Sequence, residues 1–135
     1  MELFGKEVRD INQEVRRMKR HNFKNLKIWK DGISLVSENY KLTKTFPKFE
    51  VFSLSSQMNR CAVSIPSNIA EGSSKSTNKH FSKYLEDSLG SAFEWETQLI
   101  IAFNAAYISK EEFQRLEEKI TTLQRMITGF KNGLD

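Results

Sequence analysis

The sequence of 135 residues has few of the residues that define several large classes of protein. It contains one cysteine, so no disulfide can form within the chain and nothing indicates an oxidising compartment. No run of about 18 apolar residues occurs, as a membrane-spanning helix would require. Two prolines and six glycines favour long helices over many turns. The two histidines, His21 and His80, are far apart, so neither belongs to a pair with metal-ligand spacing.

Motifs for catalysis are also missing from the sequence. There is no phosphate-binding glycine loop and no nucleophile elbow. Glu94 and Glu96 are two residues apart, so they point to different faces of a helix and cannot share a site. Cys61 lies on an apolar stripe, which favours a small buried hydrophobe over a nucleophile. We therefore expect no enzymatic activity, no cofactor and no metal site.

The overall composition is that of one globular domain. Hydrophobic residues make up 39% of the chain and charged residues 28%. The net charge of +4 and the pI of about 9.2 permit binding to RNA, DNA or an acidic partner without demanding it. Charges at Glu2, Lys6, Glu7, Arg9 and Asp10 do not suit a secretory signal, so we expect a cytoplasmic protein.

The first 22 residues predict an amphipathic helical extension. Their apolar residues recur at spacings of four and three, and they are Phe4, Val8, Ile11, Val15 and Met18. The end of this segment is basic, with Arg16, Arg17, Lys19 and Arg20. The apolar stripe indicates packing against the bundle or a neighbouring subunit. The basic end either binds nucleic acid or is simply solvated.

Four further apolar stripes predict a bundle over residues 23–135. The first consists of Leu26, Trp29, Ile33, Val36 and Tyr40, and the second of Val51, Leu54, Met58, Cys61, Ile65 and Ile69. The third consists of Phe81, Leu85, Ser88, Ala92, Trp95, Leu99, Ala102 and Ala106, and the fourth of Phe113, Leu116, Ile120, Leu123, Ile127, Phe130 and Leu134. Joined by short connections, they predict an all-α, antiparallel up-down-up-down four-helix bundle.

Several residues mark where these helices begin. Pro47 suits the start of the second bundle helix, with Glu50 in its first turn, where a carboxylate suits the helix dipole. Thr77 is expected to cap the third bundle helix. Ser109 and Glu112 have the spacing of a capping box at the start of the last one.

The second bundle helix contains an internal proline, Pro66, which removes a backbone hydrogen bond and costs ~3 kcal/mol. Ser64, Ser67 and Asn68 are placed to bond the backbone groups that it frees. Gly72 has the position of a left-handed helix end. The stretch therefore predicts a kinked helix with a polar seam. Its spacing favours a packing feature over a functional surface.

Three charged residues complete this expected structural motif. We expect Arg60, Glu71 and Glu94 to form an ion-pair network that supports the kink, since charges within a bundle must be paired.

The sequence also indicates that subunits assemble. Apolar residues lie off the main stripe of the third bundle helix, and they are Phe93, Ile100, Ile101 and Phe103. A helix that is apolar on more than one face is deeply buried or lies in a subunit interface.

The sequence resembles a known family through this central stretch. The run Ser64-Ile65-Pro66-Ser67-Asn68-Ile69-Ala70-Glu71-Gly72, with Gln57 and Arg60, resembles the signature of the four-helix-bundle proteins encoded in bacterial 23S rRNA intervening sequences, also labelled the S23 ribosomal protein family. Further matches follow in order from Leu26 and Trp29 through Phe46-Pro47, Gly90-Ser91 and Glu94 to Tyr107. The resemblance covers residues from Phe23 to the C-terminus.

The resemblance implies an antiparallel four-helix bundle and a ring-like homo-oligomer, with a pentamer as the first guess. It also implies a distant similarity to the accessory proteins of diversity-generating retroelements, which bind nucleic acid and a reverse transcriptase. We expect an oligomeric module that binds RNA or a ribonucleoprotein, with Arg16, Arg17, Lys19 and Arg20 as candidate contacts. The alternative is a structural or adaptor bundle for a protein such as a reverse transcriptase.

Overall fold

The computed structural model describes residues 22–134, and these form an all-α fold without a β-strand. The four long helices are α2 (Lys27–Thr43), α3 (Leu54–Ser73), α4 (Asn78–Asn104) and α5 (Lys110–Asn132). Two short 3-10 helices, η1 (Phe23–Asn25) and η2 (Lys48–Glu50), precede α2 and α3. The predicted all-α class is confirmed. The predicted N-terminal helix lies outside the described residues.

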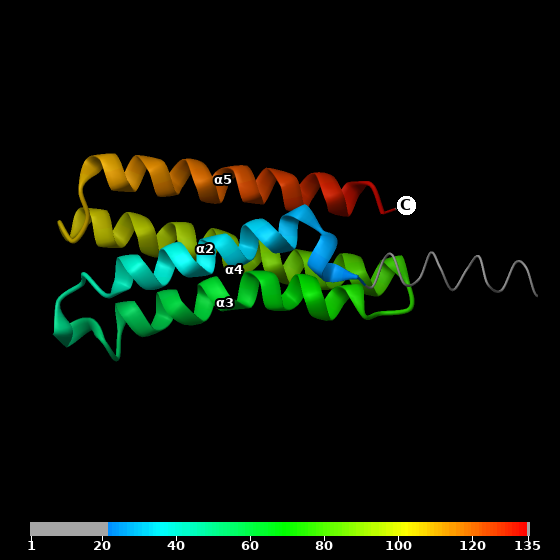
Figure 1. Ribbon diagram of the computed structural model, residues 1–135, viewed down its shortest axis with the longest axis horizontal. Helices are drawn as coiled ribbons and strands as arrows, with labels where there is room; N and C mark the ends of the chain where they lie inside the picture. The colour runs from blue at the N-terminus through cyan, green and yellow to red at the C-terminus, as the bar shows by residue number, and fades with distance from the viewer. Residues whose placement is uncertain (1–21, 135) are drawn as a thin grey trace, which may run out of the picture.

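The long helices lie side by side, and both ends of the described chain are at one end of the molecule (Figure 1). Successive helices pack against each other, α3 and α4 most extensively, and α2 also contacts α5. Contacts between α2 and α3 run in opposite order along the two helices. Gly32 lies against Pro66, whereas Asn39 lies against Asn59.

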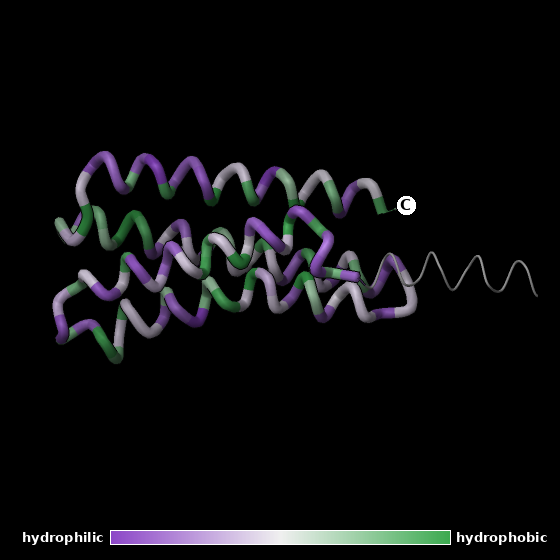
Figure 2. Tube along the Cα trace, viewed as in Figure 1, coloured by the Kyte–Doolittle hydropathy of each residue, from purple (hydrophilic) through white to green (hydrophobic). Residues whose placement is uncertain are grey.

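The core is formed by one face of each helix, and hydrophobic and hydrophilic residues alternate along all four (Figure 2). Its largest fully buried side chains include Trp95, Phe81, Leu35, Met58 and Ile65. The stripes predicted for α4 and α5 supply most of the buried residues of those helices. Periodicity located these faces because their core positions are mainly apolar.

The stripe predicted for α2 does not coincide with the buried face of this helix, although Leu26, Trp29 and Val36 pack against the core. Ile33 and Tyr40 are each 41% exposed, whereas Leu35 is fully buried. The buried face is Ile28, Gly32, Leu35, Asn39 and Leu42. Glycine and asparagine interrupt its apolar pattern, and the structure explains both residues. A Cβ on Gly32 would lie 3.2 Å from the Cβ of Pro66, so a side chain here would crowd the contact with α3.

Asn39 belongs to a buried polar network that joins three helices. Its Oδ1 accepts a hydrogen bond from Trp95 Nε1 at 2.9 Å, and its Nδ2 donates to Asn59 Oδ1 at 2.7 Å. The hydroxyl of Thr43 donates to the same Asn59 oxygen at 2.9 Å. The network ties α2 to α3 and α4, and a hydrophobic pattern could not reveal it.

The start of α3 also differs from the prediction. The helix begins at Leu54, and Val51 is 51% exposed and lies outside the core. Glu50 nevertheless acts at this helix start, because its Oε1 accepts from the backbone N–H of Leu54 at 3.2 Å and from Ser53 Oγ at 2.6 Å. Its other oxygen accepts from the Tyr107 hydroxyl at 2.7 Å, which ties the α2–α3 connection to the α4–α5 connection.

The predicted caps of α4 and α5 are present. Thr77 Oγ1 accepts from the backbone N–H of His80, and Ser109 Oγ accepts from that of Glu112. The Glu112 carboxylate accepts a hydrogen bond from Arg115 at 2.7 Å, so only half of the predicted capping box is formed. Helix α4 ends in a Schellman motif around Ala106, whose φ of 64° lies in the left-handed region.

Gly72 was expected to end its helix in a left-handed conformation, and this is wrong. The residue lies inside α3, and a Cβ there would come within 2.7 Å of the Cβ of Tyr84 and 2.9 Å of Cδ1 of Phe81. Real Cβ atoms do not approach other heavy atoms this closely. The glycine is therefore required for the close crossing of α3 and α4.

Candidate nucleic-acid interface

Positive charge gathers at the end of the bundle where the described chain begins and ends. This lysine-rich end comprises residues 22–32, 68–87 and 125–134, which carry eight Lys or Arg against four Asp or Glu, a net charge of +4. The rest of the described chain, residues 33–67 and 88–124, carries seven against eight, a net charge of −1. The fold therefore separates charge along the bundle, although the sequence distributes it over all the helices.

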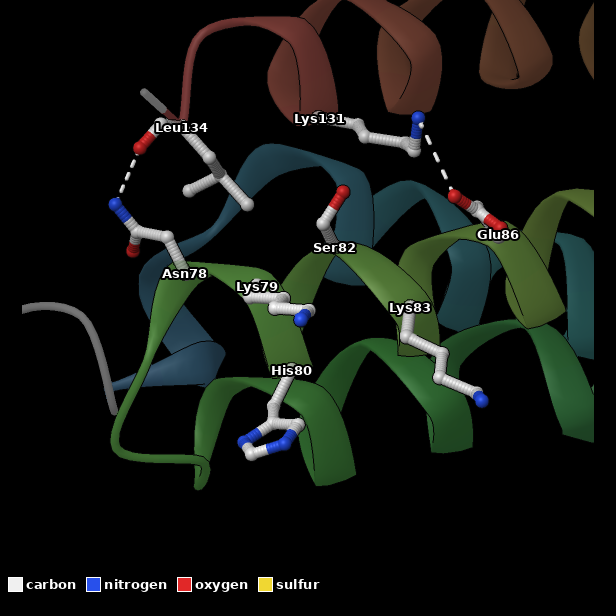
Figure 3. Close-up of a pocket in the computed structure, with 8 residues that line it drawn as sticks. All are labelled: Asn78, Lys79, His80, Ser82, Lys83, Glu86, Lys131 and Leu134. Atoms are coloured by element: carbon white, nitrogen blue, oxygen red, sulfur yellow. Dashed lines mark hydrogen bonds and ion pairs between the residues drawn. The ribbon is translucent and has the colours of Figure 1, made fainter.

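A pocket of about 570 Å³ lies at this end, between the start of α4 and the end of α5 (Figure 3). Its lining is Asn78, Lys79, His80, Ser82, Lys83, Glu86, Lys131 and Leu134. Asn78 Nδ2 donates to the carbonyl oxygen of Leu134, which joins the two helices. Lys131 reaches Glu86 at 3.6 Å, and His80 and Lys83 extend from α4 away from α5.

The lysines of this end differ in their exposure and in their interaction partners. Lys79 and Lys83 are exposed and are four residues apart, so they lie on one face of α4. Lys75 Nζ lies 5.0 Å from the centre of the Tyr84 ring, and Lys27 pairs with Asp31 at 3.2 Å. Exposed ammonium groups at helical spacing can contact successive phosphates of a polyanion, which is the sequence-independent part of nucleic-acid binding.

The nucleic-acid contacts predicted from the sequence are in a different segment of the chain. Arg16, Arg17, Lys19 and Arg20 lie outside the described residues, so their role remains a prediction. Lys79 and Lys83 were missed, although their i, i+4 spacing is visible in the sequence. Their proximity to Lys131 depends on how α4 and α5 pack.

The family-like stretch forms a second polar surface, between α3 and α4. Ser64 Oγ and Ser91 Oγ lie 2.6 Å apart across the two helices. Asn68 Nδ2 donates to the carbonyl oxygen of Ser64 at 2.9 Å and to its hydroxyl at 3.0 Å. The polar seam predicted beside Pro66 is thus present. Ser67 is exposed on the outer side.

The side chains of this seam do not bind the backbone carbonyl that loses its hydrogen-bond donor because of Pro66. A proline at this position leaves the carbonyl of Ala62 without its usual helical partner. The side-chain bonds instead reach the two carbonyls that precede Pro66, from Asn68 to Ser64 and from Ser88 of α4 to Ile65 at 2.9 Å.

The expected ion-pair network of Arg60, Glu71 and Glu94 is not formed within residues 22–134. All three residues are exposed, and the ion pairs of this part of the chain involve other residues. The network was expected because charges buried in a bundle must be paired. Exposed charges are solvated and need no partner. Arg60 and Glu94 instead line a shallow groove of about 410 Å³ with Gln57, Cys61, Ser64 and Ser91.

Cys61 is buried, as its place on the apolar stripe predicted. Burial and the neighbouring Glu94 carboxylate raise the pKa of its thiol to about 12. The thiol is therefore protonated at neutral pH and is a poor nucleophile. Within the described residues there is also no cluster of three His, Cys, Asp or Glu side chains that could hold a metal ion. None of the helices described has the length and apolarity needed to cross a membrane.

The fold and these surfaces define a four-helix bundle with a lysine-rich end and a polar seam between its two most closely packed helices. Residues 24–129 match the family described as 23S rRNA-intervening sequence protein. The chain therefore belongs to this family.

A solved structure has the same fold. It is a protein of unknown function from the S23 ribosomal protein family of Bacteroides thetaiotaomicron. The TM-score is 0.72 at 21% sequence identity, and the match covers 77% of this chain and 97% of that one. The comparison with curated proteins gives no match.

Proposed function

We propose that this protein is a non-enzymatic, cytoplasmic RNA-binding module that contacts phosphates through its lysine-rich end. The observation that carries the proposal is the separation of charge, net +4 at this end against −1 over the rest of residues 22–134. Membership of the 23S rRNA-intervening sequence family is consistent with an RNA partner. Contacts to phosphates carry no base information, so we expect this binding to be led by charge and shape.

We also propose a homo-oligomer built from antiparallel up-down-up-down bundles, with a pentameric ring as the first guess. The opposite order of contacts between α2 and α3 supports this connectivity. Exposed apolar side chains support assembly, because Phe93 is 54% and Ile101 50% exposed on α4. Phe103, expected on the same surface, instead stacks on Phe113 of α5 with ring centres 4.4 Å apart. Sedimentation equilibrium at micromolar concentration tests assembly, and a monomer would contradict it.

The test of RNA binding compares two triple variants with the same net charge. K24Q/K79Q/K83Q removes three exposed lysines from the lysine-rich end, and K41Q/K44Q/K110Q removes three exposed lysines from the other end. Affinity for a fluorescein-labelled RNA hairpin is measured by anisotropy over a range of salt concentrations. The first variant should weaken binding and flatten the dependence of log K on log salt, by about 0.7–0.9 per lost phosphate contact.

The control variant should bind RNA with nearly the parental affinity. Equal losses in the two variants would show that only net charge matters and would contradict the proposed site. Parental binding in both variants would contradict a role for the described lysines altogether. A third variant, with Arg16, Arg17, Lys19 and Arg20 replaced by glutamine, tests the predicted N-terminal contribution in the same assay.

A specific observation favours an alternative function, that of an adaptor for a protein partner such as a reverse transcriptase. Phe52 is 95% exposed and Phe49 is 76% exposed, both in the connection that Glu50 fixes to Tyr107. Two large aromatic side chains on an anchored connection are typical of a protein contact. A partner held through them would be insensitive to salt, in contrast to RNA.

A further inference from the structure

Helix α2 carries an outer apolar stripe, which consists of Leu26, Trp29, Ile33, Val36 and Tyr40. These residues repeat at spacings of three and four, like a core stripe, but the core of α2 is a different face. Ile33 and Tyr40 are each 41% exposed, and the other three are half-buried. In the described part of the chain, α2 therefore has a second apolar face that is only partly covered.

This outer stripe faces away from α5 and borders α3. Ser34 and Glu38 contact α5, through Lys119 at 2.7 Å and through Arg115. The opposite flank of α2 carries Asn39, which contacts α3, and helical spacing places Val36 next to it on the outer side. On α3, Val63 is 39% exposed. The stripe thus borders α3 on the outside of the bundle, where Ile33, Tyr40 and Val63 remain exposed.

The described chain enters the bundle at one end of this stripe. Helix η1 lies against α3, directly before the first turn of α2. The Phe23 ring meets the Trp29 ring edge-on, with centres 5.2 Å apart. The described part of the chain therefore begins at the α2–α3 side of the bundle, beside the first residues of the outer stripe.

We propose that residues 3–20 pack as a helix, antiparallel to α2, on the outer stripe of the same chain. The apolar residues of this segment are spaced four, three, four and three apart, and the outer stripe has the same spacing when read backwards from Tyr40. The resulting pairs are Phe4 with Tyr40, Val8 with Val36, Ile11 with Ile33, Val15 with Trp29 and Met18 with Leu26. Both stripes extend over 15 residues, roughly 21 Å of helix, so every apolar residue finds a partner.

The connection and the charges agree with this pairing. Seven residues, 19–25, join the two stripes, within the roughly 2–8 residues usual between neighbouring helices of a bundle. In the same register Glu14 lies opposite Lys30, which is exposed. The pairing also brings the basic run from Arg16 to Arg20 to the lysine-rich end, although the proposal does not depend on RNA binding.

Crosslinking of the full chain tests the pairing. In a Cys61→Ser background, V8C/V36C places two cysteines opposite each other, and V8C/S34C places the second cysteine on the side of α2 that contacts α5. A short bismaleimide should join the first pair within one chain and give a band of monomer mass. A dimer-sized band instead would mean that a second copy occupies the stripe, which overturns the proposal, as would equal crosslinking of the two pairs.

Hydrogen exchange gives an independent measurement on the same full-length protein. Ile33→Glu puts a charge in the middle of the outer stripe, whereas Val51→Glu changes a comparably exposed apolar residue in the α2–α3 connection. Amides of residues 3–20 should exchange about tenfold faster in I33E than in the parent, because the docked state loses stability. V51E should leave them unchanged. Equal exchange of this segment in I33E and the parent would overturn the proposal.

Discussion

Replacing Asn39 with alanine should be among the most damaging single changes to this fold. The residue is fully buried and joins Trp95 of α4 to Asn59 of α3. In the variant, the Trp95 N–H keeps its place in the core and loses its acceptor, whereas the Asn59 oxygen still accepts from Thr43. One buried orphan donor costs about 1–3 kcal/mol, and the lost packing adds to it.

We expect Asn39→Ala to lower the free energy of unfolding by about 2–4 kcal/mol, and the melting temperature by roughly 6–16 °C for a domain of this size. Denaturant unfolding at one fixed protein concentration measures the change, because oligomer stability depends on concentration. Ser37→Ala, at an exposed position of α2, is the matched control and should change stability by less than about 0.5 kcal/mol.

A double-mutant cycle then isolates the hydrogen bond. Trp95→Phe removes the N–H donor, so N39A should cost less in that background than in the parent. The expected coupling energy is about 0.5–3 kcal/mol. If N39A unfolds like the parent, or if its cost is the same with Phe at position 95, the hydrogen bond from Trp95 to Asn39 does not stabilise the fold.

Three further predictions concern backbone fit and pH. Ala106→Gly should stabilise the protein by about 0.5–1 kcal/mol in thermal unfolding, because glycine adopts the left-handed φ of 64° without strain; a destabilised variant would contradict this. Gly72→Ala should destabilise it by about 1–3 kcal/mol, since the new Cβ would lie 2.7 Å from the Tyr84 Cβ; an unchanged melting temperature would show that α4 yields easily. Hydrogen bonds from Ser53, Tyr107 and the Leu54 backbone lower the pKa of Glu50, so its stabilising contribution should be present above the ordinary glutamate pKa and be lost as the pH falls through the lowered value. Tyr107→Phe should weaken that acid dependence in pH-dependent unfolding, and an identical pH profile in Y107F would contradict the assignment.

The sequence by itself determined the helical class and most of the core. The stripes of α4 and α5 identified their buried faces, because most of the core positions in these helices are apolar. The caps at Thr77 and Ser109 were predictable for a related reason, since a helix start depends on a few neighbouring residues. Family membership was also visible in the sequence, in the stretch around Pro66.

Only the tertiary structure decided which of two apolar stripes of α2 faces the core. The sequence favoured the more regular stripe, but Gly32 fits closely against Pro66, and Asn39 is buried because Trp95 and Asn59 satisfy its hydrogen bonds. The residues responsible, Pro66, Trp95 and Asn59, belong to other helices, so the periodicity of α2 could not predict their effect. The regular stripe is left half-exposed on the outside of the bundle.

The tertiary structure also decided where the charged residues act. Arg60 and Glu94 were expected inside a network and are exposed, because the seam of α3 and α4 is closed by Ser64 and Ser91 instead. Lys79 belongs to a positive end only because the fold brings the start of α4 beside the end of α5, at the end of the bundle where the described chain begins. Net charge is a property of the sequence, but its position on the surface depends on helix packing, because residues far apart in the chain supply it.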